Sequence, residues 1–153
     1  NIEFEKIATI SNSSGFMDAS IPAGNIYGTA DEVSRFYQMM LDGGVYNGNQ
    51  MFEASTVKRA TRPAGPLTID QTLMIPIRFS TGFMLGENIF SLFGIKARKA
   101  FGHLGLINIV TWADPSRDIS VAFLNTGKSL DPRSLPALGK VLVSVSSNCS
   151  VLK

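Results

Sequence analysis

The one histidine of the chain, His103, stands in Phe101-Gly-His-Leu-Gly105, directly before a run of β-prone residues. An imidazole can take up or release a proton near neutral pH, so it can act as a general acid or base. Glycine beside a strand often marks the close approach of a ligand or of another backbone. This pattern predicts a place where a substrate could lie against the main chain. The alternative is a lone histidine on a half-buried strand, hydrogen-bonded to a neighbour.

Two segments match Ser-x-x-Lys, the pattern that places a nucleophilic serine one helical turn from a lysine. They are Ser55-Thr-Val-Lys58 and Ser150-Val-Leu-Lys153. Residues i and i+3 share a helix face, so a neutral lysine could take the hydroxyl proton. So short a pattern arises readily by chance, and Ser55 falls in a short surface-type helix while Ser150 lies in the terminal tail. We therefore expect neither serine to be a nucleophile.

Composition excludes several other classes of chemistry. The 153 residues carry 14 basic and 12 acidic side chains. A net charge of +2 is too small to indicate a nucleic-acid-binding protein. One cysteine, Cys149, and one histidine cannot supply the usual zinc sites or an internal disulfide. We expect no cofactor and no metal, and no apolar segment is long enough to span a bilayer. The basic run Lys96–Lys99 either steers an anionic substrate toward His103 or is a solvated loop.

The elements that would position His103 follow from hydrophobic period and capping signals. Thr29-Ala-Asp-Glu32 is a capping box that opens an amphipathic helix, and Gly43-Gly44 ends it. The remaining expected elements are a loop to residue 23 with one short strand at 6–10, a helix at 54–61, a loop at 62–78, strands at 79–85, 88–93, 107–113 and 119–125, and a helix at 132–146. The order of these elements along the chain, with helices first, then strands and then one helix, favours an α+β fold.

Four segments together resemble the class C-like serine β-lactamase, penicillin-binding protein and β-lactamase-related esterase family. The first runs from Pro22 to Gly44 and resembles the family segment PAGG-small-STA-x-D-hydrophobic-x-RF-x-x-ML-x-GG. The others are Phe52–Pro63, Phe79–Leu85, and Phe101–Gly105 with Trp112–Pro115 and Val121–Asn125 after it. The resemblance implies the C-terminal part of the β-lactamase/transpeptidase-like fold, in which helices pack against an antiparallel sheet. We expect this chain to contribute three strands.

The resemblance also implies acyl-enzyme hydrolysis of a small ester, amide or β-lactam. In such enzymes a serine attacks the carbonyl, a lysine and a tyrosine move protons, and an oxyanion hole holds the intermediate. The His-x-Gly element maps onto His103-Leu104-Gly105. By the family pattern His103 orients the substrate or shares in proton transfer, and Gly105 lets the substrate approach. The backbone N–H of Leu106 would then be one oxyanion donor.

Other parts of the family pattern are missing from the chain. In the family the nucleophile and a Tyr-x-Asn precede the segment that resembles 22–44, and here neither does. We therefore expect residues 1–153 to be the C-terminal segment of one β-lactamase-like domain, inactive alone. The bulky residues Leu106-Ile-Asn-Ile109 stand where related esterases have small ones.

Two alternatives to a hydrolase remain open at the level of sequence. The first is a non-catalytic β-lactamase-like scaffold that serves self-assembly or partner binding, which the bulk of 106–109 favours. The second is an autonomous small α+β domain whose likeness to the family is coincidental. A half-domain would expose a sheet edge and an apolar patch and tend to associate with itself.

Overall fold

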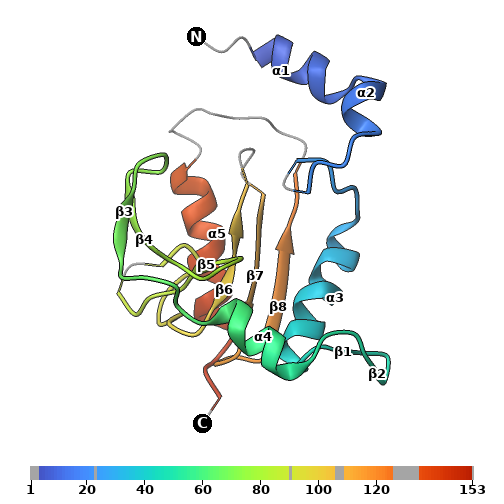
Figure 1. Ribbon diagram of the computed structural model, residues 1–153. Helices are drawn as coiled ribbons and strands as arrows, with labels where there is room; N and C mark the ends of the chain where they lie inside the picture. The colour runs from blue at the N-terminus through green and yellow to red at the C-terminus, as the bar shows by residue number, and fades with distance from the viewer. Residues whose placement is uncertain (1–3, 23, 90, 106–108, 126–134, 153) are drawn as a thin grey trace.

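A computed structural model describes residues 4–22, 24–89, 91–105, 109–125 and 135–152 (Figure 1). The helices are α1 (Phe4–Ser11), α2 (Ser14–Met17), α3 (Ala30–Leu41), α4 (Ala54–Thr61) and α5 (Leu135–Asn148). The strands are β1 (Val45–Tyr46), β2 (Asn49–Gln50), β3 (Thr68–Asp70), β4 (Ile75–Phe79), β5 (Met84–Leu85), β6 (Phe101–Leu104), β7 (Val110–Asp114) and β8 (Ile119–Phe123). The predicted α+β class is confirmed.

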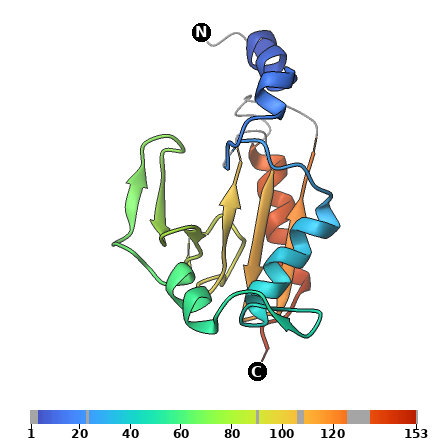
Figure 2. The same ribbon diagram turned by 45° about the vertical axis from the view of Figure 1, so that its right-hand side comes forward.

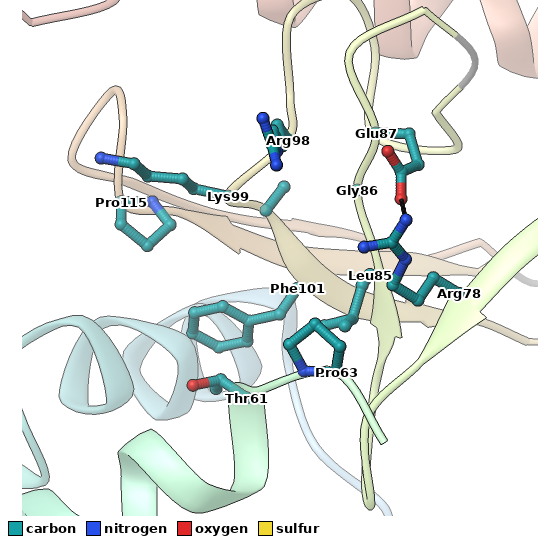
Figure 3. A pocket seen from close by; sticks show the side chains of 11 residues that line it. Thr61, Pro63, Arg78, Leu85, Gly86, Glu87, Arg98, Lys99, Phe101 and Pro115 are labelled. Atoms are coloured by element: carbon teal, nitrogen blue, oxygen red, sulfur yellow. Dashed lines mark ion pairs between the residues drawn. The ribbon is translucent and has the colours of Figure 1, made fainter. Parts of the chain in front are cut away.

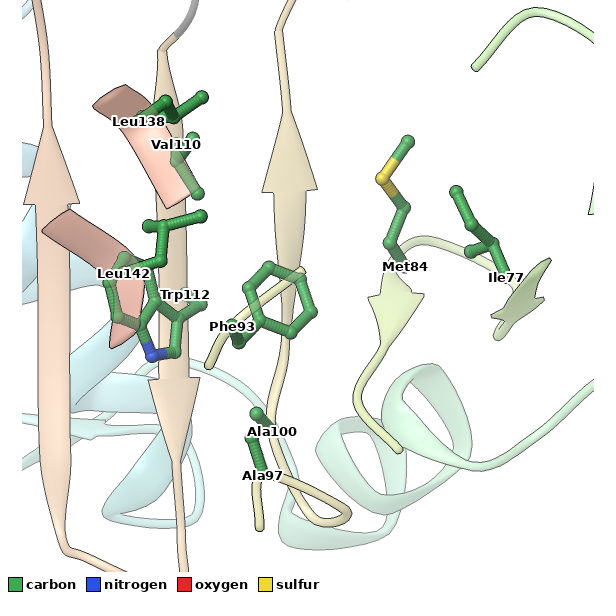
Figure 4. Packing of buried hydrophobic residues seen from close by; sticks show 9 residues of the cluster. All are labelled: Ile77, Met84, Phe93, Ala97, Ala100, Val110, Trp112, Leu138 and Leu142. Atoms are coloured by element: carbon green, nitrogen blue, oxygen red, sulfur yellow. The ribbon is translucent and has the colours of Figure 1, made fainter. Parts of the chain in front are cut away.

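Strands β3 to β8 form one antiparallel sheet in chain order, and helices cover both of its faces (Figures 1 and 2). Leu138 and Leu142 of α5 pack on one face against Val110 and Trp112 of β7 (Figure 4). On the other face, Ala113 of β7 joins a cluster with residues of α3 and α4. Successive side chains of a strand point to opposite faces, so this alternation makes β7 the centre of both cores.

Helix α3 begins and ends where its local signals predict. The Thr29 hydroxyl accepts a hydrogen bond from the Glu32 backbone N–H, and the Glu32 carboxylate accepts one from the Thr29 N–H. After the helix, Gly44 has φ +92°, and a Cβ there would lie 2.1 Å from the Phe52 carbonyl oxygen. Only glycine suits that position. The helix expected at 54–61 is confirmed as α4.

Arg117 joins three segments that are far apart in the chain. Its Nη1 lies 2.5 Å from Asp114 Oδ2, and both side chains are almost completely buried. Its remaining hydrogen bonds go to backbone carbonyls of Ile95, Lys96, Ser146 and Cys149. The guanidinium therefore fastens the β7–β8 turn to the loop that precedes β6 and to the end of α5.

Several expected boundaries were wrong, and in each case side-chain hydrogen bonds explain the difference. The 62–78 loop contains β3 and most of β4, since Asp70 caps a turn by accepting from the Thr72 and Leu73 N–H groups. The strand expected at 79–85 is a hairpin, because the Ser80 hydroxyl accepts from the Gly82 and Phe83 N–H groups. Among the described residues the sheet consequently has six strands, where three were expected.

Two further expected strands are absent from the described residues. Residues 6–10 lie in helix α1, where the Thr9 hydroxyl donates to the Glu5 carbonyl one turn earlier. The described part of 88–93 is a loop, in which the Ser91 hydroxyl accepts from the Phe93 N–H. Phe93 belongs to this loop but is part of the hydrophobic core, because its ring stacks on the ring of Trp112 with the centroids 5.9 Å apart.

Replacing Arg117 by alanine is expected to lower the free energy of unfolding by about 3–5 kcal/mol, because the buried Asp114 carboxylate then loses its counter-charge. Urea denaturation measures the change. The control is Arg35→Ala, which removes the partner of Asp31 from a pair whose side chains are 58% and 66% exposed. That variant should unfold at the wild-type midpoint. Equal midpoints for all three proteins would contradict the role given to Arg117.

Candidate active site

His103 lies where strand β6 extends beyond its neighbour β5. The register pairs β5 with Phe101 and Gly102 only, whereas β7 pairs with all four residues of β6. Among the described residues, His103 and Leu104 thus have a strand partner on one side. Their other side is an open sheet edge, to which an extended ligand could add main-chain hydrogen bonds.

The ring of His103 is exposed and is oriented toward the backbone of the next residue in the strand. Its Nδ1 lies 2.9 Å from the carbonyl oxygen of Leu104. A carbonyl oxygen can only accept, so Nδ1 carries the hydrogen in this bond. In the neutral imidazole the other nitrogen, Nε2, then holds a free lone pair. This nitrogen can accept a proton or a hydrogen bond from a ligand.

Behind His103 the sheet is joined to α3 by a buried hydrogen bond. Thr111, the register partner of His103, donates from Oγ1 to the Tyr37 hydroxyl at 3.0 Å. Burial raises the pKa of Tyr37 above its ordinary value, and the bond with Thr111 offsets part of that rise. The Tyr37 ring also packs near Phe83 and Phe101, with centroids 6.1 and 6.3 Å away. Tyr37 lies in the amphipathic helix that the Thr29–Glu32 capping box opens, but no local sequence signal pointed to its hydroxyl.

The two glycines around His103 differ in what requires them. A Cβ on Gly102 would lie 2.1 Å from the Thr111 carbonyl oxygen and 2.5 Å from Trp112 Cβ. Gly102 is therefore needed for the packing of β6 against β7. The close approach of a ligand is not required to explain a glycine at this position. A Cβ on Gly105 would meet nothing closer than Ile109 Cβ at 3.5 Å, an ordinary contact. The space beside Gly105 is open.

Of the other predicted site residues, Leu104 and Gly105 are described by the structure and Leu106 is not. Leu104 is half-buried and packs against the core on the α5 side, so only its backbone faces the sheet edge. Leu106 lies outside the described residues. His103, Leu104 and Gly105 are consecutive, and together they form one continuous edge of about three residues' length.

The two Ser-x-x-Lys serines are not near this edge. Ser55 is exposed on α4, and Ser150 is exposed beside the C-terminus. Both segments lie at the opposite end of the sheet from the end of β6 (Figures 1 and 2). The backbone carbonyl of Cys149 accepts a hydrogen bond from Arg117 Nε at 2.9 Å.

Neither metal nor membrane features appear in the part of the chain that the structure describes. No three histidine, cysteine, aspartate or glutamate side chains there are grouped as a metal site would need. No helix among the same residues is long and apolar enough to cross a bilayer.

One family model matches most of the chain. The family model described as Beta-lactamase matches residues 3–142. The chain is 29% identical over 119 residues to Esterase/beta-lactamase LipL of Mycobacterium tuberculosis, which covers 78% of this chain and 26% of LipL. The chain spans about a quarter of the length of the curated relatives it matches.

Solved structures with the same fold extend the comparison. A family VIII carboxylesterase superimposes with a TM-score of 0.73 at 22% identity, covering 94% of this chain and 37% of the esterase. A penicillin-binding protein homolog from Caulobacter crescentus gives a TM-score of 0.60 at 24% identity, covering 87% of this chain and 41% of the homolog. At these identities the likeness shows the fold.

Alanine at the two glycines should separate packing from ligand access. Gly102→Ala is expected to destabilise the protein by about 2–3 kcal/mol, because β6 and β7 must move apart. Gly105→Ala should change the free energy of unfolding by less than about 0.5 kcal/mol. Thermal and urea denaturation measure both. A large loss at Gly105 would mean that the chain itself requires the glycine there.

Tyr37 should make the protein less stable at alkaline pH. The unfolded chain releases the tyrosine proton near pH 10, whereas burial raises the pKa of Tyr37 in the folded state. Above about pH 10 the unfolded state therefore binds fewer protons than the folded state. The contribution of the protonated Tyr37 to the free energy of unfolding is fully present below about pH 10 and falls as the pH rises further.

The variant Tyr37→Phe tests this dependence. It should cost about 1 kcal/mol near neutral pH through the lost hydrogen bond and show a shallower alkaline decline. Urea denaturation across a pH series measures both effects. Tyr27→Phe, at a side chain that is 64% exposed, is the matched control and should follow wild type. Parallel curves for wild type and Tyr37→Phe would contradict the assignment.

Proposed function

The chain belongs to the beta-lactamase family, and from this premise we propose that it forms the histidine-bearing wall of a serine hydrolase active site. The substrate class is a small molecule with an ester, amide or β-lactam carbonyl. The observation that carries the proposal is the open edge of β6, where an exposed His103 sits beside the uncrowded Gly105.

His103 acts in this proposal through Nε2, the nitrogen left without a hydrogen in the neutral ring. It orients the substrate or passes a proton between the substrate and the nucleophile's lysine or tyrosine partner. Gly105 lets the substrate lie close to the strand. The alternation of the strand turns the Leu104 backbone toward the open edge, and the Leu106 N–H, outside the described residues, would donate to the oxyanion.

The nucleophile in this proposal comes from a part of the protein outside these 153 residues. The sequence contains no Tyr-x-Asn, and its Ser-x-x-Lys serines lie away from His103. Residues 1–153 are then the C-terminal segment of one β-lactamase-like domain and are inactive alone. The quarter-length coverage of the curated relatives supports this division.

A non-catalytic scaffold of the same fold is the second candidate. The residues after His-x-Gly are Leu106-Ile-Asn-Ile109, and their bulk favours it, because it would narrow the approach to the open edge. Such a protein would keep the edge for self-assembly or for a partner's strand. The assay below distinguishes the two candidates.

Hydrolysis of a chromogenic cephalosporin and of a short-chain aryl ester tests the proposal. The 153-residue chain alone should turn over neither compound. In the complete gene product, His103→Ala should lower kcat/KM by about 100-fold, as expected when a proton-transfer group is removed. Ser55→Ala and Ser150→Ala are the controls and should keep wild-type activity.

Other results would overturn the proposal. Turnover by the chain alone that Ser55→Ala or Ser150→Ala abolishes would place the nucleophile in this chain. A complete, folded protein that hydrolyses neither compound would favour the scaffold.

A further inference from the structure

A hollow lies at the other end of β6 from His103. Its volume is about 300 Å³, and its lining comes from the end of α4, from β4 and β5, from the loop before β6, and from the β7–β8 turn (Figure 3). Phe101 at the start of β6 lines it, whereas His103 does not. The hollow is therefore separate from the candidate active site, and a ligand could bind there whether or not the protein is a hydrolase.

Positive charge predominates in this hollow. Three of the lining side chains are cations, Arg78, Arg98 and Lys99, and one is a carboxylate, Glu87. Glu87 is already engaged, because its Oε1 lies 3.0 Å from Arg78 Nη2 in a pair whose side chains are 32% and 21% exposed. Among the residues that the structure describes, Arg98 and Lys99 have no carboxylate partner within salt-bridge distance, and both are exposed. The hollow thus has a net charge of about +2.

Arg78 has unused hydrogen-bonding capacity. Its Nε is buried and has no hydrogen-bond partner among the described residues. Its guanidinium gives one terminal nitrogen to Glu87, and the other points into the hollow (Figure 3). A buried donor without a partner is costly, and a guanidinium matches the oxygens of phosphate or carboxylate in pairs.

The opposite wall is apolar. Leu85, Phe101, Pro63 and Pro115 line it beside the three cations (Figure 3). Most small-molecule sites are apolar hollows of about 300–1,000 Å³ with a few convergent polar groups, and this one is at the small end of that range. A ring or short hydrocarbon would cover the apolar wall while its charged group met the cations.

We propose that this hollow binds a small organic dianion, a phosphate monoester on an apolar body, with the phosphate between Arg78 and Arg98 and with Lys99 at the rim beside Pro115 (Figure 3). A dianion matches the net charge, and bidentate guanidinium contacts suit its oxygens. The basic run considered at first as a guide for substrate toward His103 thus has a site of its own: Arg98 and Lys99 line this hollow.

A ligand bound in this hollow would contact Phe101, whose own contacts lead to the residues behind His103. Phe101 packs against Phe83 with the centroids 5.2 Å apart and against Tyr37, whose hydroxyl meets Thr111, the partner of His103. Phe101 and His103 lie on the same face of the strand, two residues apart. A ligand that shifts the Phe101 ring therefore acts on the support of His103.

Isothermal titration calorimetry with phenyl phosphate tests the proposal, with phenol and inorganic phosphate as the probes that each lack one half of the ligand. Phenyl phosphate should bind, phenol should not, and inorganic phosphate should bind more weakly because it leaves the apolar wall uncovered. Binding should weaken with added salt. Equal affinities for inorganic and phenyl phosphate would overturn the role of the apolar wall.

Charge reversal provides a matched pair of variants. Lys99→Glu should weaken phenyl phosphate binding by at least about 10-fold, since it places a like charge beside the ligand. Lys140→Glu, at an exposed lysine on α5, changes the net charge equally and should leave the affinity unchanged. Arg98→Gln should also weaken binding. Equal losses in Lys99→Glu and Lys140→Glu would mean that overall charge alone attracts the anion and would overturn the site, as would no binding to the wild type.

Discussion

The buried ion pair of Arg117 and Asp114 is the constraint on which the arrangement of the sheet depends. A guanidinium taken from water must have all its N–H groups bonded, and here they reach Asp114 and four backbone carbonyls. Those carbonyls belong to the loop before β6 and to the end of α5. Because the same loop carries Arg98 and Lys99 and leads into Phe101, the ion pair also helps to fix the start of the strand that carries His103.

Strand β6 separates two kinds of surface. At its start, cations and apolar side chains line a hollow, and β5 pairs with the strand. At its end β5 has stopped, so the main chain is open and the histidine is exposed. The chain shares its fold with the family VIII carboxylesterase, and in this chain a short stretch of β6 has no strand partner on one side among the described residues.

Local signals in the sequence predicted local structure well. The Thr29–Glu32 capping box, the Gly43-Gly44 stop and the helix at 54–61 are all where their residue types require them. The strands β3 and β4 were missed because prolines and a capping Asp70 resemble a loop when read alone. His103 was expected directly before a strand, whereas it lies within strand β6. The Thr111–Tyr37 bond joins residues 74 apart and needed the fold. The same holds for Gly102, whose requirement comes from Trp112 across the strand pair.

The bond between His103 and Leu104 has a consequence for how a ligand would meet this edge. The carbonyl that holds the Nδ1 hydrogen belongs to the same backbone that an incoming strand-like ligand would pair with. Its oxygen has two lone pairs, so a ligand N–H can share it but must compete in direction with the imidazole. A ligand that pairs with this edge would therefore share its acceptor atom with the imidazole of His103.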